Sequence, residues 1–75
     1  MITELDTVVL TTELPEYSLE AGDLGTVVLA HRYGGYEVEF MTLAGETVAV
    51  VSLSPDHVRP VGRREIAHAR LVTTE

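Results

Sequence analysis

The three histidines are the first residues to consider for chemistry, because imidazole is the commonest metal ligand and a frequent general base. His31, His57 and His68 lie far apart, and no pair has the His-x-x-x-His type of spacing that places two ligands on one helix face. Asp56 stands beside His57, but adjacent residues in an extended chain point in opposite directions. We therefore expect structural or surface histidines, with no metal site and no other cofactor.

A short segment near residue 55 contains the residue types of a nucleophilic triad, namely Ser54, Asp56 and His57. A triad needs nucleophile, base and orienting acid to converge from a supported scaffold beside an oxyanion hole. Three residues within one turn cannot supply that geometry. We interpret them as a helical cap and a solvent-facing pair, so the sequence predicts no catalytic residue and no enzyme activity.

Glu37 and Glu39 form the only pair of carboxylates with a regular spacing inside an alternating segment. Strand geometry would place them on one face, about 7 Å apart. A general acid and base pair needs burial that separates the two pKa values. On a solvated face they are simple charges, or a contact patch for an arginine- or lysine-rich partner.

The segment Gly22-x-x-Gly25 is not a phosphate loop. It lacks the lysine and the following helix that such a loop needs, and Asp23 would repel a phosphate. We expect instead a turn with positive φ at the glycines.

The charge distribution is strongly uneven. The chain has twelve acids, five arginines and no lysine, for a net charge of −7. Residues 1–58 hold ten acids and one arginine, a net of −9, whereas residues 59–75 hold four arginines and two glutamates, a net of +2. An acidic body repels nucleic-acid phosphates and anionic lipid, so neither is an expected partner. A protein with a basic surface is expected, although an acidic surface also simply keeps a small protein in solution.

Arg59, Arg63 and Arg64 form the only basic cluster. They either pair with the domain's own acids or, on a mobile tail, contact a partner or a second copy. Together with Glu37 and Glu39 they are the candidate protein-binding residues.

The length of 75 residues allows one small domain, and the absence of cysteine excludes disulfides. Lack of cysteine fits a reducing cytoplasm, which is the expected location. The first six residues carry two acids and no basic residue, so no signal peptide is expected, and the apolar runs are too short to span a membrane.

Short valine- and threonine-rich runs, punctuated by glycine and proline, predict an all-β fold. We expect strands over residues 5–11, 26–31, 36–41 and 47–53, a helical turn at 54–58 and a last short strand at 59–61. The run 47–53 is apolar on both faces, as in a central or doubly covered strand. The residues expected in the core are Val8 or Leu10, Val27, Leu29, Val38, Phe40, Val50 and Leu53.

This order of elements is that of a small SH3-like barrel of about five strands. We assign residues 1–61 to the barrel domain and residues 62–75 to a C-terminal tail. The tail sequence fits a short helix, given its alanines, arginines and glutamate, and equally an extra edge strand.

Several segments together resemble one bacterial family, the domain of unknown function 4926. They are Leu5-Asp6-x-Val8-Val9-Leu10, Leu14-Pro15-Glu16, Leu19-x-x-Gly22-Asp23-x-Gly25-Thr26-Val27-Val28, Tyr36-Glu37-Val38-Glu39-Phe40 and Gly45-x-Thr47. The resemblance covers roughly residues 5–61 and implies a small single-domain bacterial protein, in a genomic setting beside toxin-like genes. It transfers no catalytic residue.

Three functions are therefore considered. The first is a non-catalytic protein-binding module, with an antitoxin- or immunity-type inhibitor of a neighbouring toxin as its specific form. The second is a structural homo-oligomerisation domain, because short sheets often complete their cores across a symmetric interface. The third is an enzyme or an RNA-binding SH3-like barrel, and it conflicts with the missing site residues and with the acidic charge.

Overall fold

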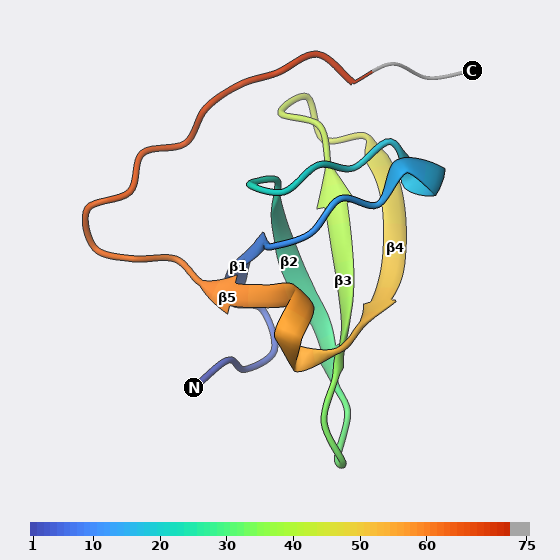
Figure 1. The fold of residues 1–75 in the computed structure, drawn as a ribbon, viewed down its shortest axis with the longest axis vertical. Helices are drawn as coiled ribbons and strands as arrows, with labels where there is room; N and C mark the ends of the chain where they lie inside the picture. The colour runs from blue at the N-terminus through green and yellow to red at the C-terminus, as the bar shows by residue number, and fades with distance from the viewer. Residues whose placement is uncertain (73–75) are drawn as a thin grey trace.

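The computed structural model describes residues 1–72, and its regular secondary structure is β-strand apart from two short helical turns (Figure 1). The elements are β1 (Thr7–Leu10), η1 (Pro15–Tyr17), β2 (Leu24–Ala30), β3 (Tyr36–Met41), β4 (Thr47–Leu53), η2 (Pro55–His57) and β5 (Val58–Pro60), where η1 and η2 are single turns of 3-10 helix. The all-β class and the order of the five strands are therefore as the sequence predicts, and β3 and β4 have the predicted bounds, whereas β1 is shorter, β2 begins two residues earlier and β5 is shifted by one residue. No helix among residues 1–72 is long and apolar enough to cross a membrane.

The five strands form one antiparallel sheet in the order β4-β3-β2-β1-β5. The sheet curls around the core, but within residues 1–72 its ladder does not close between β4 and β5, so the predicted barrel is not confirmed. The expectation that β4 is a central or doubly covered strand is wrong, because β4 is an edge of the sheet and its outward residues Val50 and Ser52 are exposed. Its outward side chain Val50 faces solvent, while Val51 and Leu53 point into the core.

The turns between strands use glycine where the backbone requires it. Gly34 and Gly35 have φ of 104° and 93° in the turn between β2 and β3, and Gly45 has φ of 92° between β3 and β4. These angles are open to glycine at little cost. Each of these two turns joins neighbouring antiparallel strands and so forms a β-hairpin.

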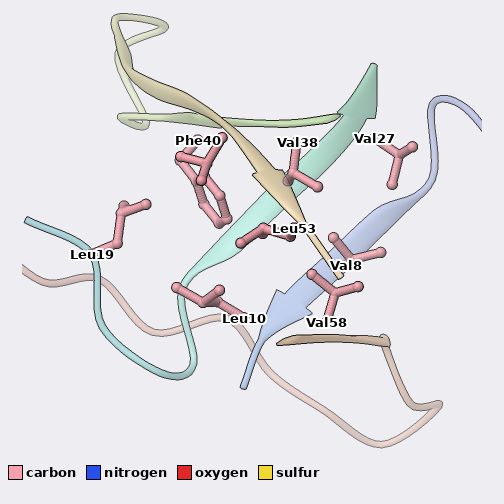
Figure 2. Packing of buried hydrophobic residues seen from close by; sticks show 9 residues of the cluster. Val8, Leu10, Leu19, Val27, Val38, Phe40, Leu53 and Val58 are labelled. Carbon is pink, nitrogen blue, oxygen red and sulfur yellow. The ribbon is translucent and has the colours of Figure 1, made fainter. Parts of the chain in front are cut away.

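One contiguous core fills the inside of the sheet (Figure 2). Its buried members are Val8, Leu10, Leu19, Val27, Val38, Phe40, Val51, Leu53 and Val58. Two predicted core residues lie outside it, because Leu29 and Val50 are 44% and 53% exposed. A bulge between Val27 and Leu29 turns Leu29 to the outer face of the sheet, opposite Glu37.

Gly25 lies within β2, and its lack of a side chain leaves space in the core for Val38 and Phe40. It pairs with Val8, and a Cβ placed on it would lie 2.5 Å from Val38 Cγ1 and 2.8 Å from Phe40 Cε1. The predicted positive φ is therefore correct for Gly22, at 99°, but wrong for Gly25. Gly25 is needed for the close approach of Phe40 and Val38.

Residues 62–72 form neither the helix nor the strand that their sequence allows, and the last three residues of the predicted tail, 73–75, lie outside the described residues. The chain leaves β5, swings away from the sheet and returns toward the loop between β1 and β2 (Figure 1). Ile66 is 92% exposed, so the segment buries no apolar face. Because short helices depend on such packing for their stability, neither regular form is favoured here.

Candidate functional site

Glu37 and Glu39 project from the outer face of β3, opposite to the buried side chains of Val38 and Phe40. The alternation expected from the sequence is present. Both glutamates are nevertheless partly buried rather than fully exposed. The cause is the neighbouring strand β4, whose hydroxyl side chains hold both carboxylates.

Glu37 is the centre of a small polar cluster. Its Oε2 accepts a hydrogen bond of 2.5 Å from Ser52 Oγ and lies 2.7 Å from His31 Nε2. The hydrogen bond from Ser52, followed by that from His31, holds the pKa of Glu37 below its usual value. The carboxylate is therefore ionised across the physiological range.

Ser52, Glu37 and His31 are the residue types of a hydrolase triad, but their order is different. In a triad the imidazole lies between the hydroxyl and the carboxylate and accepts the hydroxyl proton. Here the carboxylate lies in the middle, and the Ser52 hydroxyl donates to it. This arrangement fixes a negative charge in place and does not activate a nucleophile.

The segment Ser54-Asp56-His57 is surface-exposed around η2. Ser54 occupies the position before the helical turn, as predicted, but its side chain makes no capping hydrogen bond. No three side chains of the His, Asp and Glu types converge on a common point within residues 1–72 in a way that could hold a metal ion.

Glu39 lies on β3, next to the edge strand β4, and accepts a hydrogen bond of 2.6 Å from Thr47 Oγ1. It also lines a shallow hollow with Leu24 and Met41. Five apolar side chains that are 42% to 53% exposed belong to the same three strands β2, β3 and β4. We call these five residues, together with the two glutamates, the outer face: Leu24, Val28, Leu29, Glu37, Glu39, Met41 and Val50.

The predicted arginine cluster is not part of the outer face. Arg59 lies on β5, at the other edge of the sheet, and donates two hydrogen bonds of 2.8 and 2.6 Å to Glu65. These bonds and one from the Gly62 N–H lower the pKa of Glu65 to about 2. Arg63 and Arg64 are exposed, and neither has a carboxylate within 4.0 Å among residues 1–72.

A second polar site involves residues that the sequence did not single out as a pair. Arg70, in the tail, donates to both carboxylate oxygens of Asp23, from Nε to Oδ1 at 2.8 Å and from Nη2 to Oδ2 at 2.5 Å. Burial raises the pKa of Asp23, but the hydrogen bonds from Arg70 and from the Glu20 N–H outweigh it and leave that pKa below its usual value. The opposite charges of tail and body were the signal that could have revealed this contact.

The comparisons with known proteins give one positive result. The family model described as a domain of unknown function, DUF4926, matches residues 4–60, about three quarters of the chain. A search of curated proteins and a search of solved structures found no match. The matched range runs from just before β1 to the end of β5, and so includes every strand and the whole outer face. The chain therefore belongs to the DUF4926 family of domains of unknown function.

Proposed function

We propose that this domain is a non-catalytic protein-binding module that uses its outer face to bind a partner with a basic surface. The observation that carries the proposal is the composition of that face. Two carboxylates stand among five partly exposed apolar side chains of three neighbouring strands. Contiguous exposed apolar side chains of this kind are typical of interaction sites.

The two kinds of side chain have different roles in such a contact. Apolar side chains supply affinity as they leave water, whereas charges supply orientation and a faster encounter. Glu37 and Glu39 are held by Ser52, His31 and Thr47, so little side-chain freedom is lost when they pair with a partner's cations. The net charge of −9 over residues 1–58 attracts the same kind of partner from a distance.

The specific form that we propose to test first is an antitoxin- or immunity-type inhibitor acting in a bacterial cytoplasm. An acidic surface can cover a basic active site without any chemistry of its own. The reason for this choice is the charge together with the absence of cysteine, which suits a reducing compartment. Co-expression with the product of the adjacent gene, followed by size-exclusion chromatography, identifies the partner.

A homo-oligomerisation domain is the second candidate, and the edge strand β4 favours it. All seven residues of β4 (Thr47–Leu53) are uncharged and none is proline, and the register shift in its pairing with β3 is confined to its start, between Thr47 and Ala49. Natural sheets usually place charges, prolines or bulges on an edge to prevent pairing with another chain. The other edge, β5, is only three residues long and contains Arg59 and Pro60.

The double variant Glu37→Gln/Glu39→Gln tests the main proposal. We expect association with the basic partner to slow by on the order of tenfold at low salt, and less at high salt, because screening removes the steering. Glutamine keeps the size of the side chain, so the fold should persist, as measured by thermal melting. The matched control is Glu16→Gln/Asp56→Asn, which removes two exposed charges outside the outer face.

Three outcomes would contradict the proposal. An association rate that is equal in the two double variants would exclude this face as the contact. A stable homodimer whose affinity does not change with salt would favour the oligomerisation function. Binding of single-stranded RNA at physiological salt would refute the premise that the acidic charge selects a basic protein.

A further inference from the structure

The tail arginine sits in an acidic notch formed by the loop between β1 and β2. We define this notch by Glu13, Ser18, Glu20 and Asp23. All three nitrogens of the Arg70 guanidinium are engaged in it. Nε and Nη2 bind the Asp23 carboxylate, Nη2 also donates to the Ser18 carbonyl at 2.9 Å, and Nη1 lies 3.6 Å from Glu20 Oε2.

The notch is shaped by bonds that do not involve the tail. The Glu20 N–H donates to Asp23 Oδ2 at 2.8 Å, and the Ala21 N–H donates to Glu13 Oε2 at 3.0 Å. Ser18 has a left-handed backbone with φ of 61°, where it ends the helical turn η1. These local bonds hold the carboxylates of Asp23 and Glu13 independently of the tail.

The tail itself is held lightly. Every residue from 61 to 69 is exposed, and its described attachments are the Arg59–Glu65 pair at its start and Arg70 near its end. The side chains of Arg70 and Asp23 keep 25% and 18% of their exposure, so water reaches the pair. Ion pairs that remain in contact with water are weak and open readily.

We propose that the acidic notch is a binding site for an arginine side chain of a partner protein, and that Arg70 is its built-in competitor. The tail closes the site in the free domain, and a partner's arginine opens it by displacement. This inference rests on the proposed binding of a basic protein. The notch would be a second contact site, separate from the outer face and regulated by the tail.

The ligand is a guanidinium rather than an ammonium because of the geometry that Arg70 displays. Two parallel N–H groups meet the two oxygens of one carboxylate, and a third direction points at a backbone carbonyl. Only the planar fork of arginine donates along several fixed directions at once, whereas lysine offers a single flexible point charge.

The experiment titrates the intact chain with a hexa-arginine peptide at physiological salt and follows the amide NMR signals of residues 13–23. Arg70→Gln removes the competitor, and Arg63→Gln is the matched control, because it removes the same charge from an exposed tail residue. We expect the Arg70→Gln variant to bind hexa-arginine about fivefold more tightly than the Arg63→Gln variant. In the Arg63→Gln variant Arg70 still occupies the notch in most molecules, although the ion pair that holds it there is weak. Adding Asp23→Asn should abolish the gain, and hexa-lysine should show a smaller gain.

Equal affinity of Arg70→Gln and Arg63→Gln for hexa-arginine would overturn the inference, provided that thermal melting shows both to be folded. So would equal gains for hexa-arginine and hexa-lysine, because these would reflect net charge alone. The two proposals fail separately. If Glu37→Gln/Glu39→Gln slows partner association but Arg70→Gln changes nothing, the outer face stands and the notch does not.

Discussion

Gly25 shows how one absent side chain determines the packing of the core. In β2 it faces inward between Val38 and Phe40, whose atoms lie where a Cβ would stand. Phe40 is the largest fully buried side chain, and its ring fits because this position is empty. A glycine within a strand usually marks such a close approach.

Gly25→Ala should therefore lower the free energy of unfolding by about 1–3 kcal/mol, as overpacking does. Urea denaturation measures the change. A double-mutant cycle with Val38→Ala isolates the clash, because that change removes the methyl group that lies 2.5 Å from the added Cβ. An equal cost of Gly25→Ala in both backgrounds would show that the destabilisation has another cause.

The polar residues divide into those that sequence reasoning could place and those that it could not. The common face of Glu37 and Glu39 follows from alternation alone, which is local. Their partners Ser52 and His31 could not be inferred, because cross-strand contacts depend on the register of β4 and on the turn before β3. Arg70 and Asp23 are 47 positions apart, and only their opposite charges connect them in the sequence.

At the scale of elements, the sequence predicts where the strands lie along the chain. It does not predict which side chains of β2 and β4 face the core. The alternation of Tyr36–Met41 and the glycines beside it are strong local signals. The bulge in β2 places Leu29 on the outer face of the sheet instead of in the core. The run Val27-Val28-Leu29 contains no local signal that predicts this bulge. The apolar run of β4 indicated a central strand, but position in a sheet is a property of the whole topology.

The tail offers a pH-dependent prediction. The pKa of Glu65 falls from 4.5 to about 2 when it pairs with Arg59 and Gly62. A lowered pKa means that the pairing stabilises the docked tail fully above pH 4.5 and is lost as the pH falls toward 2. Asp23 changes in the same direction, so the Arg70 contact also weakens on acidification.

NMR titration of the Glu65 carboxyl should accordingly give a midpoint near 2, and the Gly62 amide signal should move with it. Glu65→Gln should remove the transition from the Gly62 signal. A midpoint near 4.5 in the native chain would mean that the tail does not dock through this pair in solution.

For the whole molecule, the small size of the core makes single side chains decisive. Nine buried residues form one cluster in a chain of 75, with no disulfide to assist it. Domains are stable by roughly 0.05–0.15 kcal/mol per residue, which allows this one about 4–11 kcal/mol. The core is also where sequence reasoning succeeded, since most predicted members are buried in it.

Phe40→Ala should cost about 3–5 kcal/mol and leave much of the population unfolded at 37 °C. Circular dichroism during thermal melting measures the loss. Met41→Ala is the comparison, because Met41 is the next residue on β3 and faces solvent. If both variants melt at the same temperature, the core does not depend on the Phe40 ring.

The loop of tail between Glu65 and Arg70 has a consequence for proteolysis. Trypsin-like enzymes cut after arginine, and Arg63 and Arg64 stand exposed just ahead of this loop. A cut there would turn Arg70 from a tethered occupant, always present at high effective concentration, into part of a separate fragment that can diffuse away from the domain. The acidic notch, which opens and closes reversibly in the intact chain, would then stay open after a single cleavage.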